Sequence, residues 1–407
     1  MAGFQKTGLV CIAACIVSAA SAQTVQNSGS GKRVTPEEFA ILPWGTTHGE
    51  VSTYREIREC GFNLAGFVHP EKLDAVHAAG LKAIVIDDSI HVGDGMAGLT
   101  EEEITSRTTA LTARTKDHAA TYGYYLRDEP KADLYPALGR WAAEIRKAAP
   151  KALPYINLFP NYASAGQLGR PTYEEYLESF VSETKPSFLS YDNYSLVDDG
   201  SLRPGYFQNL EAVRASAVRH NLPFWNIVLS NAHFNYAEPS PGGLRFQAYT
   251  TMAYGARGIS YFTYFAPATG NYRLAPIDQF GHRTATWDML RNVNLQIHQL
   301  APTLVKLKSV NVFHHPKVPE GCNGIATSKY VSDVTGGQFL VGEFEGEGRV
   351  YAMVVNCDLH KSTSFGVAFK SPGAVEMVSA YSGAVQPWAG ENVWLAAGQG
   401  MLLTSVR

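Results

Sequence analysis

The sequence predicts an α/β protein, a (β/α)8 TIM barrel followed by a C-terminal antiparallel β-sandwich domain. From residue 39 onward, short apolar runs alternate eight times with amphipathic stretches of helical spacing, over roughly 270 residues. After about residue 308 the helical spacing stops, and short alternating runs separated by Gly and Pro replace it. These observations place the barrel at 37–307 and the β domain at 308–407.

The barrel strands should read as apolar runs, because helices cover both faces of a parallel sheet. An open doubly wound sheet is the competing fold, and the lack of a Gly-rich turn after the first strand argues against it. The predicted strands are Phe39–Trp44, Phe62–Val68, Lys82–Asp87, Tyr122–Arg127, Leu153–Phe159, Phe188–Tyr194, Pro223–Ser230 and Ile259–Phe265. The predicted helices are Glu71–Ala79, Glu101–Ala119, Leu134–Ala148, Tyr173–Glu183, Phe207–His220, Leu244–Ala256 and Thr286–Leu304.

The N-terminal segment has the features of an export signal. Lys6 precedes an apolar stretch, residues 8–19, that is too short to span a bilayer. Ala20-Ser21-Ala22 matches the cleavage pattern of a signal peptide, which predicts a signal at 1–22 and a Ser/Gly-rich linker at 23–36. We therefore expect a secreted or periplasmic protein, with lipid attachment at Cys15 as the alternative.

Composition excludes several classes of protein. The net charge of −3 favours no polyanion, so we expect no nucleic-acid partner. No stretch after the signal could cross a membrane, and the sequence leaves the oligomeric state open. The remaining cysteines, Cys60, Cys322 and Cys357, contain no C-x-x-C pair, so we expect no metal site and no cofactor. Cys322 and Cys357 could pair or remain free thiols.

In the C-terminal region the alternating runs indicate a small antiparallel domain. Two roles are open for it, a glycan-binding module or a buttress on the barrel. The sequence favours the buttress, because no linker separates this region from the last predicted helix.

The carboxyl ends of the barrel strands are where a catalytic site is expected. Acids, amides and aromatic residues dominate those ends, a mixture that suits a hydroxyl-rich ligand. The expected partner is thus a carbohydrate. Beyond the catalytic pair, we predict substrate contacts at Trp44, Asp128, Asn157, Asn161, Tyr191, Tyr194, His233 and Tyr264.

Glu129 is the strongest catalytic candidate. It closes an aromatic-rich strand, and Pro130 stops the strand directly after it. Glycosidic cleavage needs one carboxyl group held protonated as the acid, and apolar surroundings raise a carboxyl pKa toward that state. The alternative is a structural glutamate paired with Arg127.

The segment Tyr-Leu-Arg-Asp-Glu-Pro at residues 125–130 resembles the fourth-strand motif of clan A glycoside hydrolases, the superfamily that includes the family 42 β-galactosidases. In that clan an Asn-Glu-Pro carries the acid/base glutamate, so the resemblance implies this role for Glu129. Asp128 replaces the usual Asn. The clan's nucleophile glutamate ends strand seven, yet Leu229-Ser230-Asn231 stands there, and the nearest glutamate is Glu238.

Asp192 is the preferred second carboxylate, because it ends the sixth strand between Tyr191 and Tyr194. Barrel glycosidases that resemble the α-galactosidase clan pair carboxylates from strands four and six. Glu238 is the next candidate, followed by Asp87, Asp88 and Asp128.

Other enzyme classes lack their expected residues. The first strand carries no His-x-His for a metal hydrolase, no strand end carries a Schiff-base lysine, and no Gly-x-Ser-x-Gly occurs. A polysaccharide lyase is not excluded. The principal alternative to hydrolysis is a non-catalytic glycan-binding protein on a degenerate barrel, favoured by the missing strand-seven glutamate.

Overall fold

The computed structural model describes residues 38–388, 390 and 393–406. The predicted signal peptide and linker lie outside these residues. Within the described ranges, no helix is both long and apolar enough to cross a membrane.

Eight parallel strands form the centre of the larger region, in the arrangement of a (β/α)8 barrel. They occur in two runs, β1-β8-β7-β6 and β2-β3-β4-β5. The runs meet on both sides: Leu158 N–H donates to Ser190 O (2.8 Å), and Asn63 N–H donates to Ile41 O (3.3 Å). The strands are β1 Ala40–Pro43, β2 Leu64–Val68, β3 Lys82–Val85, β4 Thr121–Asp128, β5 Leu153–Asn157, β6 Leu189–Asp192, β7 Phe224–Leu229 and β8 Gly258–Phe262.

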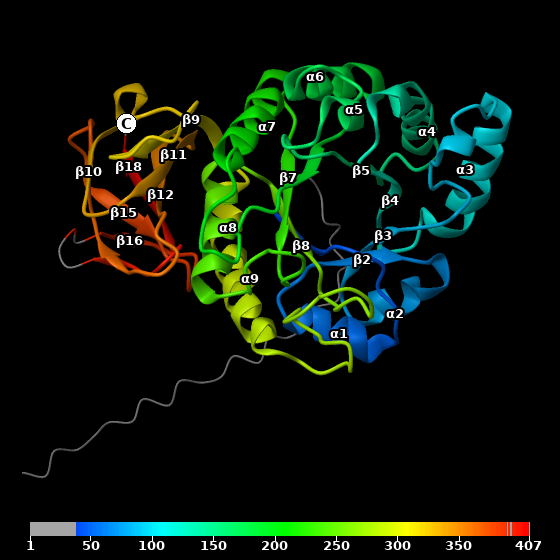
Figure 1. Ribbon diagram of the computed structural model, residues 1–407, viewed down its shortest axis with the longest axis horizontal. Helices are drawn as coiled ribbons and strands as arrows, with labels where there is room; N and C mark the ends of the chain where they lie inside the picture. The colour runs from blue at the N-terminus through cyan, green and yellow to red at the C-terminus, as the bar shows by residue number, and fades with distance from the viewer. Residues whose placement is uncertain (1–37, 389, 391–392, 407) are drawn as a thin grey trace, which may run out of the picture. The chain divides into compact units, whose positions relative to one another are not determined.

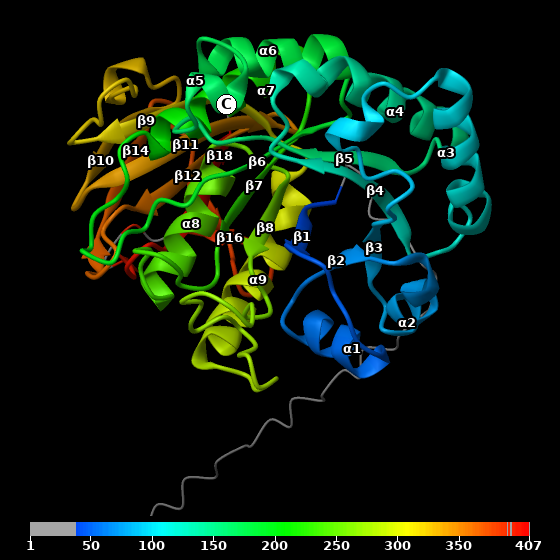
Figure 2. The same ribbon diagram turned by 45° about the vertical axis from the view of Figure 1, so that its right-hand side comes forward.

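Helices surround the strands, as Figures 1 and 2 show. The alternation predicted from the sequence is confirmed, and the structure adds α1 and the short α5 to the predicted helices. The α-helices are α1 Val51–Glu59, α2 Leu73–Ala78, α3 Glu101–Thr115, α4 Tyr135–Ala148, α5 Ala165–Leu168, α6 Tyr173–Thr184, α7 Tyr206–His220, α8 Pro241–Ala253 and α9 Ala285–Leu304. Short 3-10 turns are η1 Pro70–Lys72, η2 Asp94–Met96, η3 Ala132–Leu134 and η4 Ile325–Thr327.

Two apolar layers follow from strand geometry, since successive side chains point to opposite faces. Leu42, Tyr155 and Trp225 belong to the layer inside the barrel. Ile41 and Tyr191 belong to the layer between strands and helices. The inner layer is rich in aromatic rings, so the barrel is a packed core and its chemistry must lie at an end.

The C-terminal region contains a six-stranded antiparallel sheet in the order β16-β15-β18-β12-β11-β9. The small sheets β10-β14 and β13-β17 contribute residues to one apolar cluster with it. The predicted change to antiparallel structure is therefore confirmed. The strands are β9 Lys308–His315, β10 Val331–Thr335, β11 Phe339–Gly346, β12 Arg349–Asn356, β13 Thr363–Ser364, β14 Gly366–Phe369, β15 Val375–Val378, β16 Val385–Pro387, β17 Trp394–Leu395 and β18 Gly400–Val406.

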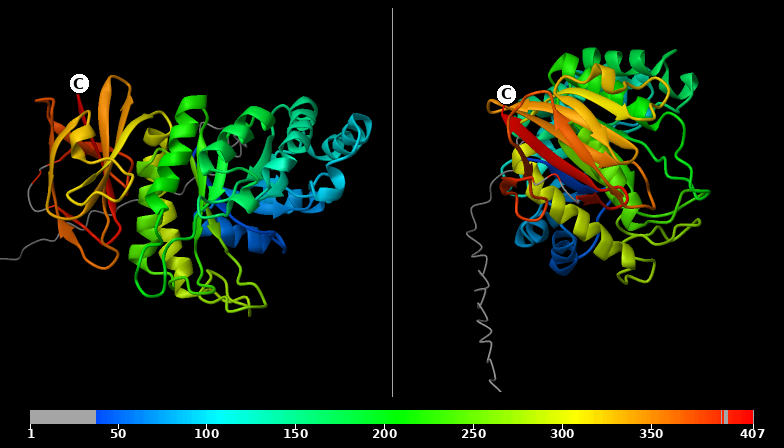
Figure 3. Two further views of the ribbon diagram at one scale, coloured as in Figure 1. Left: turned by 45° about the horizontal axis from the view of Figure 1, so that its top comes forward. Right: turned by 90° about the vertical axis from the view of Figure 1, so that its left-hand side faces the viewer.

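The C-terminal sheet packs directly against the barrel. Helix α8 contacts β11, β12 and β18, as seen in Figure 3. A Cβ at Gly342 would lie 1.9 Å from Ala253 O, so only glycine permits this approach of β11 to the end of α8. Gln399 Nε2 also donates to Tyr249 Oη (2.8 Å).

Candidate active site

Three neighbouring strands bring their terminal polar residues together at the mouth of the barrel. Asp128 ends β4 and is paired in register with Asn157, the last residue of β5. Asp192 ends β6, which adjoins β5. Parallel strands end at the same edge, so these side chains and Glu129 converge on one site.

Asn157 holds two of the acids. Its Nδ2 donates to Asp128 Oδ1 (3.0 Å) and to Asp192 Oδ1 (2.9 Å). Its Oδ1 accepts from Ser190 Oγ (2.9 Å), which lies 3.1 Å from the Tyr155 hydroxyl. The side chain is 1% exposed, so its amide is committed to the protein and fixes the carboxylates.

Glu129 and Asp192 share a hydrogen bond between their carboxyl groups. Burial, followed by the charge of Asp128, raises the pKa of Glu129 from 4.5 to about 7, against a lowering by the Asp192 hydrogen bond. Burial and the charges of Glu129 and Asp128 raise the pKa of Asp192 as well. Two adjacent carboxyl groups cannot both ionise cheaply, so the pair retains a proton near neutral pH. Asp192 is only 5% exposed, so burial opposes its ionisation more strongly than that of the half-buried Glu129.

The backbone at Glu129 is in the left-handed region, with φ at 40°. This conformation is rare for a non-glycine residue, and the following Pro130 restricts it further. The amide of Glu129 donates to Asn157 O (2.9 Å), which holds the conformation. Successive strand residues normally point to opposite faces, and this turn directs Asp128 and Glu129 into the same cluster.

Asp128 lies at the open side of the cluster, with an exposed side chain. Surrounding protein atoms nevertheless raise its pKa, while the Asn157 hydrogen bond and the charge of Arg127 lower it. Of the three clustered acids, Asp128 is thus the most accessible to a ligand.

Aromatic rings form the floor of the mouth. The Trp44 ring centroid lies 4.7 Å from Phe67, 6.0 Å from Tyr125 and 5.8 Å from Tyr155. Trp44 is only 7% exposed, so its contribution to a ligand surface is an edge of the ring.

A second aromatic group lies beside Asp192. Tyr194 contacts the rings of His233 (6.1 Å) and Phe262 (5.4 Å). The charges of Asp192, Asp128 and Glu129 all act on its hydroxyl, which raises the Tyr194 pKa further after burial. Burial lowers the His233 pKa to about 4, so His233 is neutral at neutral pH and binds Asn231 Oδ1 through Nδ1 (3.1 Å).

Two of the predicted substrate contacts do not reach the mouth. Tyr191 is fully buried in the layer between strands and helices, because it points opposite to its neighbours Ser190 and Asp192. Tyr264 is 1% exposed and accepts a hydrogen bond from Trp287 Nε1 (2.9 Å) in the same layer. Neither side chain is placed to contact a sugar at the mouth.

Asn161 has a bracing role in the loop after β5. Its Nδ2 donates to Gly205 O (3.0 Å), and its backbone amide donates to Asn209 Oδ1 (3.0 Å). The loop is thereby tied to the start of α7, and Asn161 is separate from the carboxylate cluster.

The structure adds Ser190 and Tyr155 to the network around Asn157. Both could have been found from strand periodicity, since Ser190 precedes Asp192 by two positions and Tyr155 precedes Asn157 by two. The distances across strands that join Ser190 and Tyr155 to Asn157 cannot be inferred from the sequence.

Glu238, the other candidate for the second carboxylate, binds Arg273 at 2.9 Å between Oε1 and Nε. Its side chain is 57% exposed and lines a separate pocket with Val197 and His360. The carboxylate hydrogen-bonded to Glu129 is Asp192.

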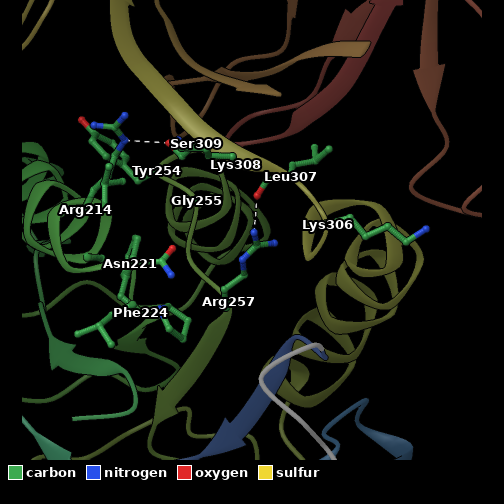
Figure 4. Close-up of a pocket in the computed structure, with 14 residues that line it drawn as sticks. Arg214, Asn221, Phe224, Tyr254, Gly255, Arg257, Lys306, Leu307, Lys308 and Ser309 are labelled. Carbon is green, nitrogen blue, oxygen red and sulfur yellow. Dashed lines mark hydrogen bonds between the residues drawn. The ribbon is translucent and has the colours of Figure 1, made fainter. Parts of the chain in front are cut away.

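A cleft of about 500 Å³ runs alongside Glu129, lined by residues such as Arg127, Phe159 and Gln167. A different pocket of about 460 Å³ lies at the opposite end of the barrel, where Phe224 begins β7 and Arg257 precedes β8 (Figure 4). The carboxylate cluster adjoins the first cleft. In the part of the chain that the structure describes, no group of His, Cys, Asp and Glu could hold a metal, and the three cysteines are free.

No family model matches this chain. No curated protein matches it in sequence either. Among solved structures, it resembles a glycoside hydrolase family 5 protein from Bacteroides vulgatus (TM-score 0.58, 14% identity, covering 90% of this chain and 89% of that one). It also resembles a structure described as a glycoside hydrolase (TM-score 0.56, 13% identity, covering 92% and 96%).

A further similar structure is the β-galactosidase of the psychrophilic Marinomonas ef1 (TM-score 0.52, 12% identity). The match covers 67% of this chain and 62% of that enzyme. At these identities the likeness concerns the fold: the chain has the barrel architecture found in these three glycoside hydrolase structures.

Proposed function

We propose that the protein is a secreted glycoside hydrolase that cleaves O-glycosidic bonds in a poly- or oligosaccharide, with Glu129 as the general acid. The observation that carries the proposal is the cluster of Glu129, Asp128 and Asp192 at the barrel mouth, where two hydrogen bonds from Asn157 fix Asp128 and Asp192. A pKa near neutrality lets Glu129 hold a proton and release it to a leaving oxygen. Secretion rests on the N-terminal sequence.

Each residue of the cluster has a defined part. Glu129 donates its proton to the glycosidic oxygen as the bond to the anomeric carbon lengthens. Asp192 shares a hydrogen bond with Glu129 and orients its carboxyl group. Asn157 positions Asp128 and Asp192, while Trp44, Tyr194 and His233 supply apolar ring surface against a sugar.

The test compares wild type with Glu129→Gln on a broad panel of oligo- and polysaccharides, scoring new reducing ends. We expect the variant to lose at least about 100-fold in rate, because the amide cannot donate a catalytic proton. Glu238→Gln is the matched control, since Glu238 also precedes a proline in a loop at the mouth but binds Arg273.

Equal activity in wild type and Glu129→Gln, with both folded by circular dichroism, would refute the role of Glu129. Binding of a glycan without release of reducing ends would instead identify a non-catalytic barrel.

A further inference from the structure

The carboxylate that partners Glu129 is badly placed to attack a sugar. A protein nucleophile must stand about 5–5.5 Å from the acid, across the scissile bond, and a base that activates water stands about 6.5–9.5 Å away. Asp192 is hydrogen-bonded to Glu129 and 5% exposed. It lies beside the acid, without room for a sugar ring between the two groups.

The wall formed by β7 and β8 offers neutral groups. Asn231 Nδ2 donates to Thr263 Oγ1 (3.1 Å), and Asn231 Oδ1 lies 3.1 Å from His233 Nδ1. Both the nitrogen and the oxygen of the Asn231 side-chain amide are thus engaged with neutral partners. The glutamate of the adjoining loop, Glu238, is in its ion pair with Arg273.

Of the three clustered acids Asp128 is the exposed one, and it stands directly beside Glu129 in the chain. Because the backbone at Glu129 is left-handed, the consecutive side chains of Asp128 and Glu129 point into the same site. Asn157 Nδ2 donates a hydrogen bond to Asp128 Oδ1 and fixes that carboxylate. The Asp128 side chain is exposed, so a ligand at the mouth can reach this carboxylate. Asp128 lies on the same side of the scissile glycosidic bond as Glu129. This position suits it to bind a substituent on the carbon next to the anomeric carbon.

We propose, resting on the proposed function, that the nucleophile comes from the substrate, a 2-acetamido-2-deoxy-hexoside. The acetamide oxygen forms a bond to the anomeric carbon while the bond from that carbon to the leaving oxygen breaks and the Glu129 proton passes to this oxygen. Water then adds to the anomeric carbon, its proton returns to Glu129, and the acetamide is restored. The sequence of steps is a net hydrolysis with retention of configuration.

The surrounding residues fit an acetamido group. Asp128 accepts the amide N–H and so increases the electron density of the attacking oxygen. The Tyr194 hydroxyl lies near the three acids, and the rings of His233 and Phe262 pack against the Tyr194 ring. In the proposed complex the hydroxyl orients the acetamide oxygen and these rings contact the methyl group. Backside attack requires the acetamido and leaving groups to be trans, which selects the β anomer of gluco- and galacto-configured sugars.

The test measures release of 4-nitrophenol from the 4-nitrophenyl β-glycosides of N-acetylglucosamine and N-acetylgalactosamine, against the β-glucoside and β-galactoside. We expect at least about 100-fold faster cleavage of one acetamido glycoside than of its 2-hydroxyl counterpart. Replacing its N-acetyl by N-trifluoroacetyl should slow cleavage at least about tenfold, because the amide oxygen becomes a weaker nucleophile. Asp128→Asn should lower kcat on the N-acetyl substrate by about 100-fold, whereas Asp199→Asn, an exposed acid after β6, should not.

The outcomes separate this inference from the proposed function. Glu129-dependent cleavage of 2-hydroxyl glycosides, or no cleavage of either acetamido glycoside while another sugar is hydrolysed, overturns the acetamido inference and leaves the glycosidase standing. Unchanged rates with the trifluoroacetyl substrate also overturn it. Activity that survives Glu129→Gln overturns both.

Discussion

At the mouth of the barrel Asp128, Glu129 and Asp192 lie in one cluster, and at the opposite end Arg214 and Arg257 line the pocket of Figure 4. Arg257 donates to the carbonyl oxygens of Leu304 and Leu307. Arg214 donates to Glu211 and Ser309, so both arginines face partners that accept hydrogen bonds. At the mouth, like charges face one another and raise each other's pKa values.

The two ends thus differ in how their charges are compensated: the arginines bind acceptors, and the acids face one another. Arg257 caps the carboxyl end of α9 and ties it to the segment that leads into β9. Arg214 binds Glu211 (2.8 Å) and Ser309 (2.9 Å), which joins α7 to β9. These contacts hold the C-terminal sheet to the barrel, whereas the clustered acids retain a proton at a cost in folding free energy.

The largest expected effect is on the proton held at the mouth. Asp128→Asn should lower kcat/KM about 100-fold at pH 7 and move its alkaline limb to lower pH. The charge of Asp128 contributes to raising the Glu129 pKa to about 7, so removing that charge lowers the Glu129 pKa. The measurement is kcat/KM from about pH 4 to about pH 9.

Asp199→Asn, at an exposed position of the loop after β6, is the control and should leave the profile unchanged. An alkaline limb that stays in place in Asp128→Asn would show that the charge of Asp128 does not raise the Glu129 pKa.

An intermediate effect is expected at the other end of the barrel. Arg257→Met should lower the free energy of unfolding by about 2–3 kcal/mol, because two carbonyl oxygens lose charged donors in a partly buried site. Urea denaturation measures it. Lys308→Met, in the same pocket but exposed, should change stability by less than about 0.5 kcal/mol.

Activity per folded molecule should survive Arg257→Met, since the pocket is at the end of the barrel away from the acids. An Arg257→Met protein as stable as wild type would mean that water satisfies the two carbonyl oxygens. Arg257 would then not stabilise the fold, and the two ends of the barrel would not differ in this respect.

The barrel could be predicted because alternation of buried strands and amphipathic helices is a local signal. Helix α1 escaped prediction since only Tyr54 and Ile57 of its nine residues are buried. At the candidate site, the sequence could name Glu129 and Asp192 as candidates because the carboxyl ends of the strands meet at the mouth. Tyr191 was misplaced in the predicted site although the twofold strand period already turns it away from Asp192.

The remaining features of the site depend on distances across strands. The two hydrogen bonds from Asn157 and the contact between Glu129 and Asp192 join residues more than 25 positions apart. The positive φ at Glu129 could not be predicted either, because the following Pro130 gives no reason to expect it. The hydrogen bond from the Glu129 amide to Asn157 O, which stabilises this conformation, again crosses between strands. Sequence patterns named the acids but not their geometry.

The smallest expected effect is on the pH dependence of folding stability, which reports the cost of burying the acids at the mouth. The Glu129 pKa is raised in the folded protein from 4.5 to about 7, so between these values the folded chain binds a proton that the unfolded chain has released. Wild-type stability must therefore fall as the pH rises through that window. Glu129→Gln has no proton to lose, so its advantage should be small at pH 4.5 and reach about 1–2 kcal/mol at pH 8, allowing for partial exposure of the side chain. Thermal unfolding at the two pH values measures the gap; a gap that does not widen with pH would mean that the folded protein ionises Glu129 as easily as the unfolded chain does.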